Sequence, residues 1–247
     1  MPLHVAVAKS QVSPLVERFE GNIFPGDVFL ANDPYLAAGS HLNDWSVIRP
    51  VFYEDELIFF TLLKGHQQDT GGAFPSGYYP GAYDIHSEGI RIDYTKIYER
   101  GERQPVYDFI LNNVRWPDVV SMDNMAMMGA TKRAEEELIR LCEKMGKETI
   151  HACQEVLLDS SEQAMRSEIS NMPDGTYYGE SGCDWDGTTD KPVYVRVHVT
   201  IKGDELTVDW TGSDPLADFV NMPLAVNHAC TYIPILMTVD PNITFNE

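Results

Sequence analysis

The chain has 247 residues, enough to bury a sizeable hydrophobic core in one large domain or two small ones. Its 38 acidic and 18 basic residues give a formal net charge of −20, which argues against nucleic acid as a partner, because phosphate binding needs clustered lysine and arginine. No run approaches the roughly 18 apolar residues of a membrane-spanning helix, and the opening segment lacks a signal-peptide pattern, so we expect a cytoplasmic protein without membrane contact.

The first predicted strand covers residues 27–31, preceded by a Phe-Pro-Gly turn and followed by an Asn-Asp-Pro turn. Because Pro34 restricts Asp33 to extended geometry, the chain turns there and leads residues 39–41 toward the next element. The Asp33 carboxylate could belong to a polar site or could cap the turn. Turn capping is the commoner role of such a residue.

A β-hairpin is predicted next, with strands over residues 45–53 and 57–64 that are rich in β-branched and aromatic side chains, and a polar turn at residues 54–56. Antiparallel pairing about this turn places Asp44 roughly opposite Gly65. A His-x-x-Asp tetrad stands at each end of the hairpin, and neighbouring strands lie only about 4.8 Å apart. The two tetrads, His41/Asp44 and His66/Asp69, therefore meet at the open end and could converge on one metal ion.

A structural interpretation stands beside the metal site. Histidine and aspartate are common in loops as turn-forming and capping residues, and a single His-x-x-Asp tetrad is more often structural than metal-binding. Two copies at both ends of one hairpin favour the metal, but the residue pattern by itself leaves both interpretations open.

Residues 69–89 contain five glycines and two prolines without a strong periodicity. Irregular segments of this length usually cover a site, and this one begins at the second tetrad, so we predict that it forms the substrate-side wall. It is not a phosphate-binding loop, because no Gly-Lys-Ser/Thr follows its glycines. Its aromatic residues could line a pocket or could only pack the loop down: Phe74, Tyr78, Tyr79 and Tyr83.

His86 and Glu88 close this irregular segment two residues apart, so in an extended conformation their side chains would point the same way. They are candidates for proton transfer or for support of the metal ligands.

The middle of the chain predicts helices over residues 104–113, 117–146 and 147–171, with Pro117 as an opening residue and Gly146 as a stop. Methionines recur every three residues at Met122, Met125 and Met128, which is typical of core or helix packing rather than of a cofactor site. This region is expected to serve as a scaffold.

A turn at residues 173–175 opens a second β-rich stretch, in which residues 193–201 and 205–210 form a hairpin. Residues 227–239 predict an apolar helix interrupted by Pro234. The predicted fold is α+β, with mixed β-sheet hairpins around a central helical segment. Its regions are a β-rich metal-site region (1–103), a helical region (104–171) and a β-rich region with a C-terminal helix (172–247), within one continuous globular unit.

Several segments in sequential order resemble the hydantoinase B/oxoprolinase family, which includes the alpha subunits of acetone and acetophenone carboxylases. They are GDVFLANDPYLAAGSHLNDWSVIRPVFY, GHQQDTGG, DIHSEGIRI and PDGTYYGE. The resemblance runs across essentially all of the chain, and it implies a portion of a larger hydantoinase B-type fold. Members of the family pair with a hydantoinase A-type subunit or domain that binds ATP and phosphorylates a carbonyl or enol oxygen. The B-type subunit then completes lactam or imide hydrolysis, or ketone carboxylation.

The resemblance also implies a ligand set. In the carboxylase relatives the metal is held by residues that match His41, Asp44 and His66, and a fourth, acidic ligand lies upstream of the position where this sequence begins. The relatives continue beyond the position of Glu247, which predicts a middle portion or a shortened form of a longer polypeptide. With mixed imidazole and carboxylate ligands, zinc, manganese or iron is expected. Asp69 is then expected to support a ligating imidazole or to act as a base for water.

From the sequence we therefore expect a metal-dependent subunit of an ATP-driven hydantoinase or 5-oxoprolinase-type enzyme, a hydrolase of a cyclic amide or imide that is active only in a hetero-oligomer. ATP and magnesium would bind to the A-type partner, because this sequence has no Walker-type loop. One alternative is an acetone or acetophenone carboxylase alpha-like subunit that carboxylates a ketone. Another is a shortened interaction subunit without catalytic activity.

Overall fold

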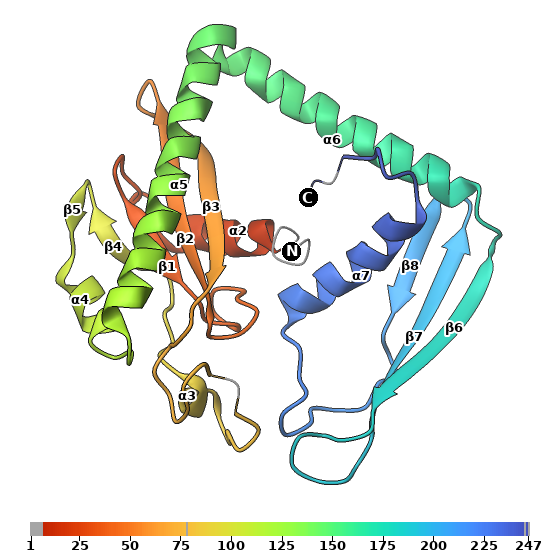
Figure 1. Ribbon diagram of the computed structural model, residues 1–247. Helices are drawn as coiled ribbons and strands as arrows, with labels where there is room; N and C mark the ends of the chain where they lie inside the picture. The colour runs from red at the N-terminus through yellow and green to blue at the C-terminus, as the bar shows by residue number, and fades with distance from the viewer. Residues whose placement is uncertain (1–6, 78, 245, 247) are drawn as a thin grey trace.

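The computed structural model describes residues 7–77, 79–244 and 246, so the predicted pocket residue Tyr78 lies outside the described residues. Two antiparallel sheets stand apart in the molecule, and the long helices α5 and α6 connect them (Figure 1). The α+β class with hairpins around a helical segment is confirmed. No helix in the described part of the chain combines the length and apolar character needed to cross a membrane.

The larger sheet carries the predicted hairpin at one edge, in the strand order β3-β2-β1-β4-β5. The predicted strand at residues 27–31 is confirmed as β1, and β4 and β5 are additions that the sequence pattern did not indicate. The strands are β1 (Val28–Ala31), β2 (Asp44–Tyr53), β3 (Glu56–His66), β4 (Thr95–Glu99) and β5 (Glu102–Arg103).

The hairpin turn has two central residues rather than three. Glu54 and Asp55 both adopt positive φ angles, of 50° and 64°, as a tight hairpin turn requires. Glu56 already belongs to β3.

A β-bulge corrects the expected pairing of Asp44. Val51 pairs with Phe59 while Phe52 pairs with Leu57, so Ile58 is an extra residue on β3. This shifts the remaining register by one residue, and Asp44 lies opposite His66 instead of Gly65. Since side chains alternate between the two faces of a strand, the shift puts Asp44 and His66 on the same face.

Helices cover both faces of the larger sheet (Figure 1). On the face that carries Asp44 and His66, α2 (Ala8–Arg18) packs Leu15 against Phe29 and Ile48. The opposite face packs Trp45 and Val47 against α5 (Pro117–Met145) and α4 (Pro105–Leu111). The predicted helices are confirmed, with α6 covering Lys147–Ser170.

Of the three methionines predicted to pack, Met128 lies partly buried against the core, whereas Met122 and Met125 do not. Met122 and Met125 are 57% and 55% exposed, whereas Met127 is buried against the sheet. A helix buries residues three or four positions apart, and the buried set of α5 includes Val120, Asn124, Met127 and Thr131. A spacing of strictly three residues drifts around the helix and leaves the buried face.

The second sheet has the strand order β6-β7-β8, formed by Gly175–Cys183, Val193–Lys202 and Glu205–Asp209. The predicted hairpin of β7 and β8 is confirmed. The predicted C-terminal helix is α7 (Leu224–Thr238), which begins three residues earlier than expected. Ala225 and Ala229 of α7 pack with Val7 and with Ala38, so α7 contacts the loop that leads to His41.

Candidate metal centre

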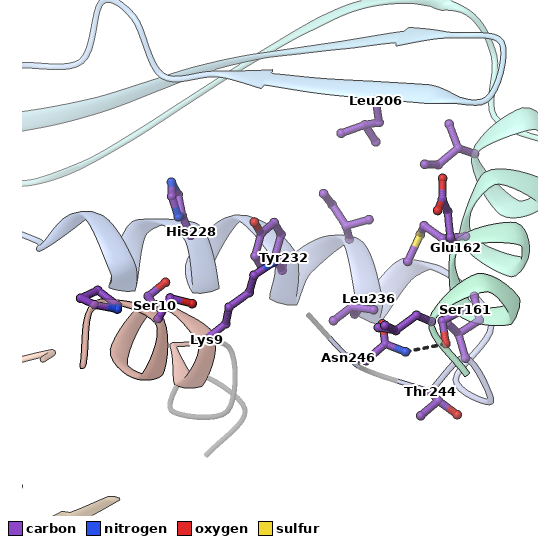
Figure 2. A pocket seen from close by; sticks show the side chains of 17 residues that line it. Lys9, Ser10, Ser161, Glu162, Leu206, His228, Tyr232, Leu236, Thr244 and Asn246 are labelled. Carbon is purple, nitrogen blue, oxygen red and sulfur yellow. Dashed lines mark hydrogen bonds between the residues drawn. The ribbon is translucent and has the colours of Figure 1, made fainter. Parts of the chain in front are cut away.

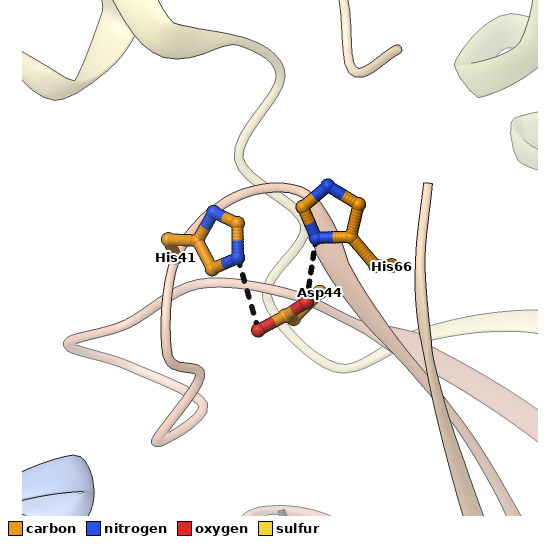
Figure 3. Close-up of side chains that lie close together, drawn as sticks. All are labelled: His41, Asp44 and His66. Atoms are coloured by element: carbon orange, nitrogen blue, oxygen red, sulfur yellow. Dashed lines mark hydrogen bonds and ion pairs between the residues drawn. The ribbon is translucent and has the colours of Figure 1, made fainter. Parts of the chain in front are cut away.

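Three side chains from the open end of the hairpin converge on one point (Figure 3). Nε2 of His41 lies 3.1 Å from Oδ2 of Asp44, and Nδ1 of His66 lies 3.1 Å from Oδ1 of the same carboxylate. One potential ligand atom from each residue lies within 4.8 Å of the other two. The structure therefore brings together the three residues that the resemblance implied as ligands. We call them the His–Asp–His triad.

Local backbone geometry places each member of the triad. Asp44 and His66 are direct neighbours across β2 and β3, and the backbone N–H of Asp44 donates to the carbonyl of His41 over 3.0 Å. The loop before His41 is tightly folded: a Cβ on Gly39 would lie 2.3 Å from the carbonyl oxygen of Asn32, so only glycine fits. The short turn and the crowded loop fix His41 beside the hairpin.

The turn role of Asp33 is the one that the structure shows. Its carboxylate accepts from the backbone N–H groups of Tyr35 and Leu36 and forms an ion pair with Arg91. Burial acts to raise the pKa of Asp33, but the hydrogen bond from Arg91 and those from the two backbone groups together lower the pKa below its ordinary value. Asp33 thus organises the loop that leads to His41.

Asn43 and Gln67, one inside each tetrad, hydrogen-bond to each other across the open end of the hairpin. The Asn43 side chain donates to the carbonyls of Gln67 and Ser76, and the backbone N–H of Gln67 donates to the carbonyl of Asn43 over 2.7 Å. The Ser40 hydroxyl donates to Oδ2 of Asp44. Sequence reasoning missed these supporting residues, although Ser40 and Asn43 adjoin the predicted ligands.

The residues present fit a divalent transition metal. The Asp44 side chain is only 4% exposed, and a buried carboxylate requires positively charged or hydrogen-bonding partners. His41 and His66 are 24% and 50% exposed, so the triad is open to solvent on the imidazole side. Two imidazoles and one carboxylate form a donor set that suits zinc, manganese or iron, and three protein ligands leave coordination positions open.

Lys64 is a charged residue near the triad that sequence reasoning missed. It precedes His66 by two residues, so both side chains stem from the same face of β3. Burial lowers the pKa of Lys64 to about 8, against the attraction of Asp44, which raises it. Its position, two residues before the second tetrad, was the available signal.

The Asp69 carboxylate is held by Arg115 and by the start of the irregular segment. This buried carboxylate forms an ion pair with Arg115 at 2.8 Å and accepts from the backbone N–H groups of Gly71 and Arg115. Arg115 also donates to the carbonyls of Gly71 and Gly72. Both oxygens of Asp69 are therefore engaged in holding the irregular segment. The two tetrads thus differ, because Asp44 contacts the imidazoles and Asp69 pairs with Arg115.

Replacing Asp69 with alanine is expected to lower stability without removing metal. The loss of charge-assisted hydrogen bonds from a buried carboxylate costs about 2–3 kcal/mol, which lowers the Tm by roughly 4–12 °C for a chain of this size. Thermal unfolding and elemental analysis of the same samples test this. Loss of the metal at an unchanged Tm would contradict this and would indicate that Asp69 supports a ligating imidazole.

The expected extended geometry of His86 and Glu88 is wrong. Both lie in the short helix α3 (Ile85–Glu88), where Asp84 accepts from the backbone N–H of Ser87 as a cap. Two residues apart in a helix point in different directions. His86 is exposed, while Glu88 is half-buried and close enough to His41 for an electrostatic interaction. Burial raises the pKa of Glu88, and the attraction to His41 partly opposes this.

The aromatic residues of the irregular segment do not act as one group. Phe74 and Tyr79 stack with ring centroids 4.3 Å apart, which indicates that these two pack the loop onto itself. Tyr83 is 97% exposed.

A cavity lies away from the triad (Figure 2). It has a volume of about 790 Å³ and is bounded by α2, α6, β8 and α7. Ser10, Glu162, His228 and Tyr232 bring polar groups to a lining that is otherwise mostly apolar. No member of the triad lines this cavity, so the cavity and the candidate metal site are separate places in the structure.

Comparisons with known proteins show the family and agree with the fold. A family model described as hydantoinase B/oxoprolinase matches residues 1–247. A putative D-/L-hydantoinase subunit of Pseudomonas sp. (strain NS671) is 37% identical over 207 residues, which are 81% of this chain and 35% of that relative. The crystal structure of ATP-dependent caprolactamase from Pseudomonas jessenii matches with a TM-score of 0.93 at 32% identity, over 100% of this chain and 42% of that chain.

A further solved structure supports the fold alone. Nucleotide-free acetone carboxylase matches with a TM-score of 0.87 at 18% identity, over 97% of this chain and 34% of that chain. In each of these comparisons the chain spans less than half the length of the protein it matches.

Proposed function

Because the chain belongs to the hydantoinase B/oxoprolinase family, we propose that it is the metal-dependent B-type component of an ATP-driven enzyme that hydrolyses a cyclic amide or imide. The observation that carries this proposal is the His–Asp–His triad, whose potential ligand atoms lie within 4.8 Å of one another at the foot of the hairpin. The relatives described as a hydantoinase component and as an ATP-dependent caprolactamase support the reaction class.

The triad would hold the metal through His41, Asp44 and His66. A divalent ion bound there would polarise a carbonyl oxygen and favour attack by water at neutral pH. The buried Asp44 carboxylate supplies negative charge, and it is held by Ser40 on one oxygen. The exposed side of His66 leaves room for a small-molecule substrate to approach.

Glu88 is the residue that we assign to proton transfer. Its carboxyl is half-buried beside His41, and burial raises its pKa, which brings the proton affinity of the carboxylate closer to that needed by a base at neutral pH. Glu88 would accept a proton from the attacking water. We assign no step to His86, which is exposed on the same short helix.

The irregular segment would limit the access of bulk water to the triad. Asp69 and Arg115 clamp its beginning, and Thr70 holds its end by donating to the carbonyl of Glu88 over 3.2 Å. The same contacts fix the position of Glu88. A rigid wall of this kind orients a substrate relative to the reacting groups.

ATP and magnesium would bind to a hydantoinase A-type partner in a hetero-oligomer. The caprolactamase with which this chain shares its fold is described as ATP-dependent. We propose that the partner activates the carbonyl oxygen by phosphorylation, and that the triad and Glu88 of this chain then act on the activated substrate.

The test is reconstitution of the chain with an A-type partner. Product assays should compare hydantoin, 5-oxoproline and caprolactam with acetone or acetophenone plus bicarbonate, and ATP hydrolysis should be measured for the complex and for the isolated chain. We expect hydrolysis of a cyclic amide or imide by the complex, and no ATP hydrolysis by the isolated chain. Carboxylation of a ketone would favour the alternative carboxylase function. No stoichiometric metal in the reconstituted complex would favour an interaction role without catalysis.

A further inference from the structure

A group of buried polar side chains lies on the face of the hairpin opposite the triad. Trp45 directly follows Asp44 and Gln67 directly follows His66, so their side chains point to the other side of the sheet. Asn124 of α5 and Tyr107 of α4 are buried in the helices that cover this face. All four side chains are at most 1% exposed: Trp45, Gln67, Tyr107 and Asn124. We call them the buried polar cluster.

Met127 of α5 lies among these side chains. Gln67 Nε2 lies 3.6 Å from the sulfur of Met127, which follows Asn124 by one helical turn on the buried face of α5. Trp45 and Tyr107 pack in the same core cluster as Met127. Gly65, opposite Trp45, permits this approach, because a Cβ there would lie 2.8 Å from the Met127 sulfur.

The cluster contains donors and acceptors whose hydrogen-bonding capacity is not satisfied. Among the described residues no hydrogen-bond partner reaches Trp45 Nε1 or Gln67 Oε1. Burial raises the pKa of the Tyr107 hydroxyl, and interactions with the side chains of Asn124 and Ser121 act against this, although these contacts do not reach full hydrogen-bond geometry. Each buried polar group without a partner costs free energy, and such groups are rare in native proteins.

We propose that the buried polar cluster binds ordered water, and that through this water Gln67 acts as a positioning residue for His66 and Asp44. Water both donates and accepts, so it can pair with an indole N–H and with a carboxamide oxygen. Gln67 and Trp45 adjoin the two ligands that pair across the strands, so holding them against α5 fixes the backbone from which the ligands project. This inference rests on the proposed metal function for its consequence, but the water site itself does not.

The first experiment detects the water directly. In the metal-free chain, a nuclear Overhauser effect from long-lived internal water to the Trp45 indole N–H is expected. It should disappear in Gln67→Met and in Asn124→Leu, which remove polar atoms while keeping much of the side-chain volume. Thr61→Val is the matched control, because Thr61 of β3 is also buried against α5, where it donates to the carbonyl of Thr131. Absence of the effect in the wild-type chain would overturn the water site.

The second experiment measures positioning. Cobalt(II) is titrated into the metal-free chain, with affinity and the visible absorption spectrum as readouts. Gln67→Met is expected to weaken cobalt binding about 10-fold, as the loss of an outer partner of a metal site does, and to alter the spectrum, while Thr61→Val leaves both unchanged. Unchanged affinity and spectrum in Gln67→Met would overturn the positioning role. If the wild-type chain itself binds no cobalt, the proposed metal function is wrong. The first experiment still tests whether the buried polar cluster binds water.

Discussion

Replacing His66 or His41 with alanine is expected to remove bound metal and activity together while leaving the fold intact. Each imidazole contacts a different oxygen of Asp44 over 3.1 Å, so either substitution leaves a site of two protein ligands. The affinity should fall by at least about 100-fold, because even the loss of an outer partner of a metal site costs 10- to 100-fold. Both histidines are partly exposed, so the free energy of unfolding should change by less than about 1 kcal/mol.

Elemental analysis of the purified variants, with circular dichroism and thermal unfolding on the same samples, measures this result. His198→Ala is the matched control, because His198 is an exposed histidine of β7 in the other sheet. It should retain full metal content and activity. If both His41→Ala and His66→Ala retain stoichiometric metal, the triad is a hydrogen-bonded structural cluster and not a metal site.

Replacing Glu88 with glutamine is expected to lower kcat of the reconstituted complex by about 100-fold or more, the usual contribution of a positioned acid or base. Glutamine keeps the shape of the side chain but cannot accept the proton. Metal content should not change, because Glu88 is not one of the three converging residues. The comparison of kcat with metal content therefore separates proton transfer from metal binding.

The pH profile gives a second readout for Glu88. Burial raises the pKa of this carboxyl, so a base at this position becomes active only as pH rises through a value above that of an ordinary glutamate. Activity should rise with pH through that value in the wild-type complex, and this limb should be absent from the residual activity of Glu88→Gln. Glu102→Gln, which changes an exposed glutamate of β5, is the control. Full kcat with an unchanged profile in Glu88→Gln would place proton transfer elsewhere.

Local patterns in the sequence were sufficient to predict the hairpin, the long helices and the second sheet. Alternating β-branched and aromatic residues indicate strands because a pleated strand exposes alternate faces, and Pro117 and Gly146 mark helix ends through their own backbone preferences. Helix α2 and strands β4 and β5 escaped this reasoning. Helix α2 contains Pro14, which is unfavourable within a helix, and β5 has only two residues, too few to show a period.

The candidate site was predictable in part. The first tetrad and His66 could be placed together because a hairpin necessarily brings its two feet into contact, and the family resemblance implied the same three residues. Asp69 could not be judged from sequence, since its partner Arg115 is 46 positions away. The helical turn at Glu88 was also missed, because four residues carry too little pattern to distinguish a helix from extended chain.

The sequence by itself determined the strands that pair, the two tetrads at their open end and the acidic character of the chain, because these depend on neighbouring residues and on composition. The tertiary structure supplied the physical reason that Asp44, and not Asp69, faces the imidazoles. A single extra residue on β3 places Asp44 opposite His66. Arg115, which is distant in sequence, forms an ion pair with Asp69. Strand register and ion pairs between distant residues cannot be read from local sequence, since each depends on residues that meet only after folding.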